Sequence, residues 1–385
     1  MYKNKNKGEI YFMFKIRKSE GITLVALVIT IVILLILAGI SISTLTNTGI
    51  FQKAKDAKKA SENAEKEQKQ ILSEYEKELN KYTAQELTDD KINKVLSETE
   101  NIVLKDAKGN IFTLPAGFKV VVNDDTGNAK TVDKGIVIED ATDTATKGSQ
   151  FVWVPVGTII KTDGTQVEIE LNRYTFDEDG IAKAQNESVV DIYYSETKSK
   201  GNTVAKSISD FKLSVTTNGG YYIGRYEART INPRTDKGDT LAQITEKGTD
   251  QVYNFVTQIQ AASQAKNMYN SSNFTSDLMN SYAWDTAILF LQNCGTNKKY
   301  SKEKNGINTT LSPMGTTTDK QCNIFDMANN VLEWITETSS YDGFPCVHRG
   351  GSYYYKNYCT SSRGVDSDFD SSQILGFRPL LYLDV

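Results

Sequence analysis

Hydrophobic and polar positions divide the chain into three regions, and the first of these is strongly apolar. From Ile22 to Ile40 the only polar side chains are Thr23 and Thr30. An α-helix rises about 1.5 Å per residue, so roughly 20 apolar residues cross the hydrocarbon core of a bilayer. The pattern predicts a membrane-spanning helix over residues 22–42. Basic residues precede it, so the positive-inside rule places the rest of the chain outside the cell.

The second region has a helical pattern with many charges. Small and larger apolar residues recur at steps of three and four from Ala54 to Tyr82, without Gly or Pro. This predicts a continuous helix to about residue 82. Its thin apolar stripe leaves two interpretations open, a solvated stalk or a face that packs on the globular domain or a sister subunit. Residues 83–102 are expected to form a short helical piece or a linker.

The third region changes to short β-like runs separated by turn residues. "GIVIED", "FVWVPVG" and "GGYYIGRYEA" read as strands, whereas "DLMNSYAWDTAILFLQNC" has helical spacing. Strands and helices do not alternate regularly, which favours an α+β domain over a doubly wound sheet. We therefore expect one globular domain over residues 103–385.

Composition and charge exclude several classes of function. The net charge is −4, and no basic stripe interleaved with aromatic residues marks a nucleic-acid surface. His348 is the single histidine, which excludes a His-rich metal site. The four cysteines have no CxxC spacing and could form two disulfides in three connectivities, between which the sequence does not choose. They are Cys294, Cys322, Cys346 and Cys359.

The N-terminal segment resembles the leader of type IV prepilins. A basic leader ends in Gly21 and is followed by "ITLVALVITI". The resemblance implies cleavage between Gly21 and Ile22, methylation of the new N-terminus, and residues 1–21 as leader. Prepilins usually have a Glu five residues after the cut, but Ala26 stands here, which suits a minor or tip subunit. An uncleaved single-span anchor is the alternative, and an ordinary signal peptide has a shorter apolar core.

Six motifs of the C-terminal region resemble the formylglycine-generating enzyme (sulfatase-modifying factor) family. "FVWVPVG", "YYIGRYEA", "AWDTAILFL", "NIFDMANNVLEW", "RGGSY" and "LGFRP" follow one another in the family's order over roughly residues 110–385. The resemblance implies a C-type-lectin-like fold. Within these motifs we expect Trp334 to be a core anchor and Arg378 to be a buried arginine with a carboxylate partner. Gly350 and Gly351 should allow a close backbone approach or a positive φ.

The resemblance also implies a calcium site in "NNVLEW". Asn330, the Val331 carbonyl and Glu333 are the candidate ligands, and such oxygen ligands suit a hard cation. The alternative is that these groups only cap local backbone.

Catalysis by this domain is not expected. The family's oxidase binds copper through two cysteines just after Gly-Gly-Ser. Here Cys359 falls close to one of these positions, and Tyr355 occupies the other. A single thiolate cannot supply two-thiolate ligation of a soft metal ion. We therefore expect no copper and no catalytic residue, with Cys346 as the remaining alternative for a second thiol.

The stretch "YYYKNYCTSSRGVDSDFDSSQI" has the composition of a recognition surface. It is rich in Tyr, Asn, Ser and Asp, which is typical of antibody paratopes. Its position between "RGGS" and "GFRP" also resembles the variable region of target proteins of diversity-generating retroelements. The predicted ligand-binding residues are Tyr353, Tyr354, Tyr355, Asn357, Tyr358, Ser361, Ser362, Asp366, Asp368 and Asp370.

Together these patterns predict a cell-surface binding protein. The expected protein is an adhesin that is held in the cell membrane or in a filament with other pilin-like subunits, and its lectin-like domain binds a protein or a glycan. Two alternatives stay open, an exported formylglycine-generating-type oxidase and a purely structural filament component.

Overall fold

The part of the chain with a defined structure excludes most of the N-terminal segment. The computed structural model describes residues 31, 33, 34, 50–185, 193–195, 198–199, 202–230, 234–236, 251–304, 310–341 and 343–384. The apolar run over residues 22–42 lies almost wholly outside these residues, and so does the predicted cut between Gly21 and Ile22. The cut therefore stays a prediction.

The fold class and the location predicted for this protein need correction. In the described ranges, no helix combines the length and the apolar character that a bilayer crossing requires. The prediction of an N-terminal transmembrane, pilin-like helix is therefore wrong, and so is the membrane location that depended on it. The long helix that is described, α2 (Ile50–Thr83), is rich in Lys and Glu. Such charged side chains are strongly disfavoured in hydrocarbon.

The chain divides into two compact units, Met1–Gln68 and Lys69–Val385, and α2 crosses the boundary between them. Within the second unit, Ser73 of α2 is fully buried, and its Oγ accepts a hydrogen bond from Thr217 Oγ1 at 2.7 Å. The apolar stripe of α2 lies elsewhere, because Ile71 and Tyr75 are 67% and 69% exposed. These two residues of the stripe are therefore exposed within the second unit.

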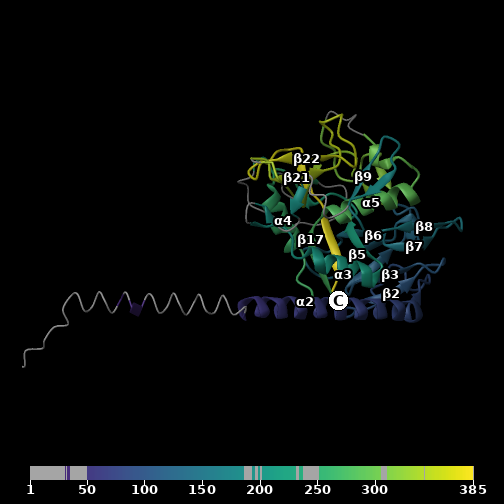
Figure 1. The fold of residues 1–385 in the computed structure, drawn as a ribbon. Helices are drawn as coiled ribbons and strands as arrows, with labels where there is room; N and C mark the ends of the chain where they lie inside the picture. The colour runs from purple at the N-terminus through teal and green to yellow at the C-terminus, as the bar shows by residue number, and fades with distance from the viewer. Residues whose placement is uncertain are drawn as a thin grey trace, which may run out of the picture. The chain divides into compact units, whose positions relative to one another are not determined.

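The second unit is β-rich and is built on two main sheets (Figure 1). The larger sheet is antiparallel throughout and has the order β17-β24-β14-β6-β5-β4. Its strands are β17 (Phe274–Leu278), β24 (Pro379–Leu383), β14 (Gly220–Gly224), β6 (Gln150–Pro155), β5 (Val137–Asp140) and β4 (Phe118–Val121). The last strand of the chain, β24, thus lies inside the core sheet between β17 and β14, which ties the C-terminal residues to the core.

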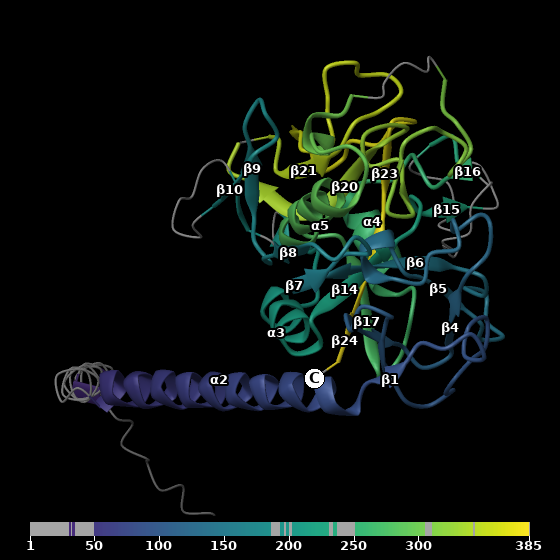
Figure 2. The same ribbon diagram turned by 90° about the vertical axis from the view of Figure 1, so that its right-hand side faces the viewer.

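The second sheet carries the C-terminal loops. It has the order β11-β20-β21-β22, and β23 pairs with β20 in parallel. Its strands are β11 (Tyr193–Ser195), β20 (Leu332–Ser339), β21 (Cys346–Arg349), β22 (Arg363–Asp366) and β23 (Leu375–Phe377). Figure 2 shows β20, β21 and β23 at the end of the domain away from the C-terminus, beside α5.

Helices pack on the core sheet, and the remaining short strands form separate small sheets. The helices of the second unit beyond α2 are α3 (Ile208–Asn218), α4 (Gln258–Lys266), α5 (Ser281–Cys294), η1 (Val132–Lys134) and η2 (Tyr300–Lys302). The short strands are β1 (Gln85–Glu86), β2 (Ile102–Lys105), β3 (Ile111–Leu114), β7 (Gly157–Ile160), β8 (Gln166–Ile169), β9 (Tyr174–Phe176), β10 (Ala182–Ala184), β12 (Lys198–Ser199), β13 (Asn202–Thr203), β15 (Arg229–Thr230), β16 (Gln251–Val252), β18 (Lys320–Gln321) and β19 (Ile324–Phe325).

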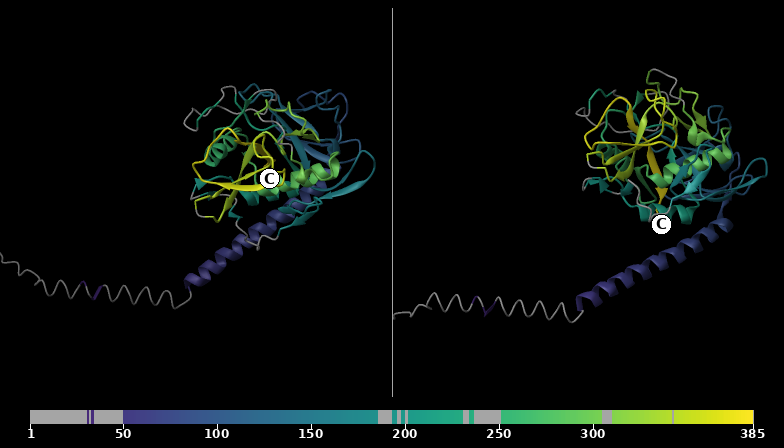
Figure 3. Two further views of the ribbon diagram at one scale, coloured as in Figure 1. Left: turned by 90° about the horizontal axis from the view of Figure 1, so that it is seen from above. Right: turned by 45° about the horizontal axis from the view of Figure 1, so that its top comes forward.

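Helix α5 is the central packing element near the C-terminal loops. Asn280 caps it, because its side chain accepts a hydrogen bond from the Ala283 amide at 2.9 Å. Trp284 is fully buried, and Figure 3 shows the green helix α5 close to the yellow C-terminal segment. The expected helical piece in residues 83–102 is instead strand β1 followed by turns, because the chain there pairs with β2.

Candidate functional site

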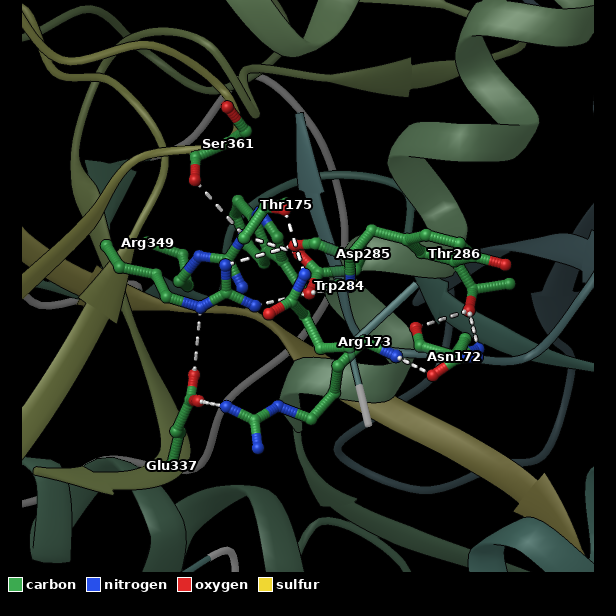
Figure 4. A network of polar contacts seen from close by, with 12 residues as sticks. Asn172, Arg173, Thr175, Trp284, Asp285, Thr286, Glu337, Arg349 and Ser361 are labelled. Carbon is green, nitrogen blue, oxygen red and sulfur yellow. Dashed lines mark hydrogen bonds and ion pairs between the residues drawn. The ribbon is translucent and has the colours of Figure 1, made fainter. Parts of the chain in front are cut away.

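A buried group of charged residues fixes the C-terminal strands to α5. Asp285 of α5 and Arg349 of β21 are both fully buried, with Asp285 Oδ1 2.6 Å from Arg349 Nη2. Arg363 of β22 bonds the other oxygen of Asp285 and also reaches Glu337 of β20. Figure 4 shows Asp285, Arg349 and Glu337 close together. We call Asp285, Glu337, Arg349 and Arg363 the ionic cluster. Glu337 also pairs with Arg173, so two carboxylates shared among three guanidinium groups hold β20, β21 and β22 against the helix.

Two glycines after β21 let the chain turn against a neighbouring loop. Gly350 has a φ of +85°, and a Cβ added to Gly351 would lie 2.0 Å from the Ala328 carbonyl oxygen. No side chain fits at such a distance. The prediction for this glycine pair is confirmed. The close approach sets the starting point of the segment that follows.

Residues 353–358, which we call the tyrosine segment, bring aromatic rings from the core to the surface. Tyr353 is buried, Tyr354 is 62% exposed and Tyr355 is 42% exposed. Neighbouring rings are in contact, with centroids 5.1 Å apart for Tyr354 and Tyr355 and 5.4 Å apart for Tyr355 and Tyr358. The segment is anchored behind these rings, because Trp284 Nε1 donates to the Thr360 carbonyl at 3.0 Å.

A cavity of about 230 Å³, the tyrosine pocket, opens beside this segment. Two tyrosines of the segment form one wall, and strands β20–β23 with the loop before β23 supply the others. The lining residues are Leu332, His348, Tyr355, Tyr358, Val365, Asp366, Asp370, Ser371, Ser372, Ile374 and Leu375. The pocket combines aromatic area with carboxylate and hydroxyl oxygens, which is the usual composition of a small binding site.

The titratable groups of the pocket are His348 and Asp366. His348 Nε2 lies 3.4 Å from Asp366 Oδ2. Burial lowers the pKa of His348 to about 3, and the neighbouring Arg349 adds to this effect. Burial raises the pKa of Asp366 to about 6, with a further contribution from the Asp370 carboxylate. Both shifts oppose an ion pair, so at neutral pH the pocket holds a neutral imidazole beside a carboxylate.

The imidazole of His348 is held by packing on three sides. Strand pairing sets it opposite Gly364, where an added Cβ would lie 2.1 Å from the imidazole ring. Its ring centroid lies 5.7 Å from that of Tyr358 and 6.0 Å from that of Trp334. Its Nδ1 is buried and has no hydrogen-bond partner among the described residues.

The structure places the predicted binding residues in different environments. Tyr355, Tyr358, Asp366 and Asp370 line the pocket. The other six do not: Tyr354 and Asn357 are exposed, Tyr353 is buried, and Asp368, Ser361 and Ser362 are half-buried.

Sequence reasoning missed His348, Ser371 and Ser372 as pocket residues. The register of β21 against β22 brings His348 into the pocket, and no local motif in the sequence marks that pairing.

Cys359 directly follows the tyrosine segment, and its surroundings favour the thiolate. Its Sγ lies 3.5 Å from Ser361 Oγ and 3.4 Å from Ser362 Oγ. Burial alone would raise the pKa of this thiol. The hydrogen bonds of the two serines and the charge of Lys302 outweigh burial and lower the pKa. No disulfide joins any of the four cysteines, all of which are described. In the described part of the chain, no cluster of three or more His, Cys, Asp or Glu residues could hold a metal ion.

The side-chain polar atoms of the expected calcium site are already engaged. Asn330 Nδ2 donates to Glu227 Oε2 at 2.6 Å, and Asn330 Oδ1 accepts from the Ser312 amide at 3.0 Å. Both oxygens of Glu333 accept from Arg378, at 2.7 and 3.1 Å. A cation would have to displace a guanidinium group, so the arrangement does not fit calcium, and that site stays a prediction. Arg378 is the expected buried arginine with a carboxylate partner, and Trp334 is fully buried in the core, so these two predictions are confirmed.

Three comparisons with known proteins bear on this domain. A comparison with curated proteins found no match. Among solved structures, CarF is 20% identical over 29% of this chain and 48% of its own, with a TM-score of 0.23. The chain thus spans about half the length of CarF. PvdO from Pseudomonas aeruginosa is 14% identical over 63% of this chain and 97% of its own, with a TM-score of 0.36. Treponema denticola variable protein 1 is 14% identical over 62% of this chain and 97% of its own, with a TM-score of 0.32.

The comparison with protein families covers more than half of the chain. The family described as "Sulfatase-modifying factor enzyme 1-like domain" matches residues 139–381. This span begins at β5 and ends within β24, so it includes the core sheet strands from β5 onward, α5, the ionic cluster and the tyrosine pocket. The chain belongs to the sulfatase-modifying factor enzyme 1-like domain family.

Proposed function

We propose that the C-terminal domain is a binding module that holds a protein or glycan ligand at the tyrosine pocket. The observation that carries the proposal is the exposed row of rings from Tyr354 to Tyr358 along the edge of a polar pocket. Tyrosine gives large, rigid contact area at low entropic cost, and nearby Ser and Asp groups supply adaptable hydrogen bonds. A cavity of about 230 Å³ suits one side chain or one sugar ring of a larger ligand.

The residues at the family's copper position support binding over oxidation. Tyr355 stands where the oxidase has a cysteine, and its ring lines the pocket. Cys359 is the single thiol between residues 350 and 378. Cys346 is fully buried on β21, where it pairs with Asp366 across the sheet. The calcium expectation is left out of this proposal, because the side-chain oxygens of Asn330 and Glu333 already have partners.

A ligand screen with tyrosine variants tests the proposal. The full chain would be tested on glycan and peptide arrays, and hits would be measured by calorimetry. Replacing both Tyr354 and Tyr355 with Ala should weaken binding at least tenfold, because hot spots of this kind exceed about 1.4 kcal/mol. Tyr82→Ala is the matched control, since Tyr82 is 85% exposed on α2 and belongs to no part of the pocket. Equal losses in both variants, or no ligand in the screen, would contradict the proposal.

An oxidase is the second candidate, favoured by the lowered pKa of Cys359. A thiolate at neutral pH is the form that binds metal or attacks a substrate. The test supplies copper and a cysteine-containing substrate peptide and measures conversion to the aldehyde. Turnover that Cys359→Ser abolishes would establish the oxidase, whereas ligand binding that survives this substitution supports the binding module.

A finer proposal is that the sequence of residues 353–374 in the binding module is diversified. Sequencing the codons for residues 349–378 in one clonal population tests it. Changes confined to Tyr353–Ile374, with Gly350 and Gly351 unchanged, would support a diversified receptor. An invariant stretch would leave a binding module with one fixed ligand.

A further inference from the structure

A second cavity, away from the residues of the tyrosine pocket, brings two cysteines together. It has a volume of about 280 Å³, and its walls include Cys294 and Cys322. Cys294 is the last residue of α5, and Cys322 begins the loop between β18 and β19. Both side chains are half-buried. No lining residue is shared with the tyrosine pocket. We call this cavity the thiol pocket.

The chain segments next to the two thiols are in direct contact. Gln321 Oε1 accepts hydrogen bonds from the Thr296 amide at 2.9 Å and from the Asn297 amide at 3.3 Å. A Cβ added to Gly295 would lie 2.4 Å from the same oxygen. The residue after Cys294 and the residue before Cys322 therefore touch. This contact holds the end of α5 and the β18–β19 hairpin together beside both thiols.

The backbone at Cys322 is unusual for a cysteine. The two-residue loop of the hairpin has φ values of 44° at Cys322 and 64° at Asn323. Such loops favour Asn and Gly, because a Cβ is crowded at positive φ. Asn323 secures the loop, since its Nδ2 donates to the carbonyls of Thr126 at 3.0 Å and Gly135 at 2.9 Å. Cys322 thus occupies a position at which the backbone conformation favours Asn or Gly.

We propose that Cys294 and Cys322 are a modification site, a dithiol that a low-molecular-weight disulfide oxidises to an intramolecular disulfide between α5 and the β18–β19 hairpin. One thiolate attacks the small disulfide, forms a mixed disulfide and releases one small thiol. The second cysteine attacks the mixed disulfide, forms the Cys294–Cys322 bond and releases the second small thiol. Two electrons pass from the cysteine pair to the small disulfide, and the two protons end on the released thiols.

The surroundings of the pair make this oxidation slow. Burial raises the pKa of Cys294 to about 12, and the Asp133 carboxylate adds to the effect. Burial also raises the pKa of Cys322, and the neighbouring Cys294 raises it further. Few thiolates are therefore present at neutral pH, and the thiolate is the attacking species. The Cys294–Cys322 disulfide should therefore form only during prolonged exposure to an oxidising environment.

The test uses the full chain incubated for hours with excess oxidised glutathione. Remaining thiols are then alkylated, and the protein is digested without reduction and analysed by mass spectrometry. The expected product is a linked pair of peptides that carry Cys294 and Cys322, with a mass lower by two hydrogen atoms than the two separate peptides. In the Cys294→Ser variant, Cys322 should instead stop at the mixed disulfide with glutathione. The Cys346→Ser variant is the matched control and should form the Cys294–Cys322 link at the rate of the unmodified chain.

Other outcomes would overturn the inference. A link between any other two cysteines, mixed disulfides at both residues without a link, or complete resistance to glutathione would each contradict it. Circular dichroism and the melting temperature of each variant check that it is folded before oxidation. Upon oxidation the melting temperature of the unmodified chain should rise, because the link closes the loop between α5 and β19 in the unfolded state. The Cys294→Ser variant should show no such rise.

Discussion

Arg349 of the ionic cluster lies just before the tyrosine segment in the chain, yet the cluster and the segment differ in almost every physical respect. Arg349 and Asp285 are fully buried and bonded to each other. Four residues beyond Arg349, the tyrosine segment begins, and Tyr354 within it is 62% exposed. The cluster binds strands to a helix, whereas the rings of the segment are in contact chiefly with one another and with the pocket. One region maintains the fold, and the other is open to change.

This contrast indicates which positions of the domain tolerate substitution. The cluster joins residues from α5, β20, β21 and β22, so a change at any one of them disturbs four elements. Tyr355, which the family resemblance places at the position of a copper-binding cysteine, is 42% exposed and supports no strand pairing. Substitution there should leave the domain folded. The predictions below test this division, starting with the largest effect.

Removing the shared carboxylate of the cluster should have the largest effect. Asp285→Ala leaves Arg349 buried without its anion and takes one of two carboxylates from Arg363. Breaking a buried pair in this way costs about 3–5 kcal/mol, because an uncompensated charge remains in the core. Urea unfolding would measure the free energy of unfolding. The control is Asp143→Asn, a surface residue whose side chain is 99% exposed, with an expected change below about 0.5 kcal/mol. Similar losses for both variants would contradict the contrast.

A smaller loss is expected where the backbone approaches the loop before β20. Gly351→Ala places a Cβ 2.0 Å from the Ala328 carbonyl oxygen, so the loop must shift. Overpacking of this kind costs about 1–3 kcal/mol. Gly109→Ala serves as a control for steric contact, since nothing lies within 4 Å of its added Cβ and only its φ of +83° is strained. Thermal and urea unfolding would compare the two. A loss for Gly351→Ala no larger than for the control would show that the close approach is not rigid.

Local sequence motifs predicted several structural features of the domain. The buried Trp334, the carboxylate partner of Arg378 and the glycine pair after β21 all follow from short quoted motifs. The ionic cluster does not, because Asp285 and Glu337 are far from Arg349 in the sequence and only the fold brings them together. His348 enters the pocket through strand register opposite Gly364. A period-two pattern gives the faces of a strand, but it does not say which strand is its neighbour.

Two expectations went wrong or lost support for physical reasons that sequence letters do not carry. Oxygen-rich residues at Asn330 and Glu333 suggested calcium, but Arg378 supplies the positive charge that Glu333 needs. The apolar run at residues 22–42 suggested a membrane helix and a membrane location. The helices that are described include no candidate for a bilayer crossing, and the long one, α2, is charged on its exposed faces.

The pH dependence of stability offers a test of the pocket itself. Asp366 has a pKa raised to about 6 in the folded state, against 3.8 for the free side chain. Its raised pKa means that the folded state binds the proton more tightly, so this group favours folding below pH 3.8, and the contribution disappears as the pH rises through 6. His348 acts in the opposite direction, because its lowered pKa favours folding above pH 6.5, and that contribution is lost as the pH falls.

Replacing Asp366 separates the two effects. In Asp366→Asn, only the His348 contribution remains, so acidification from pH 6 to pH 4 should reduce stability more than in the unmodified chain. Because Asp366 is partly exposed, solvent screens its contribution to the free energy of unfolding. The variant should therefore lose about 1 kcal/mol more than the unmodified chain. Urea unfolding at both pH values would measure it, with Asp143→Asn, whose side chain is 99% exposed, as the control. A variant that loses no more stability than the unmodified chain on acidification would mean that Asp366 is not protonated in this range.

The smallest effect on stability should come from the tyrosine segment, where two neighbouring tyrosines form a matched pair. Tyr354→Ala removes a ring that is 62% exposed, and its free energy of unfolding should stay within about 0.5 kcal/mol of the unmodified chain. Tyr353→Ala removes a ring that is only 6% exposed and should cost about 3 kcal/mol, because it opens a cavity under the segment. Thermal unfolding of the two variants would compare them directly. If Tyr354→Ala destabilised the domain as much as Tyr353→Ala, the segment would be part of the scaffold. An unchanged melting temperature would leave Tyr354 free to serve recognition alone, since a ring that contributes nothing to folding can be replaced without loss of the domain.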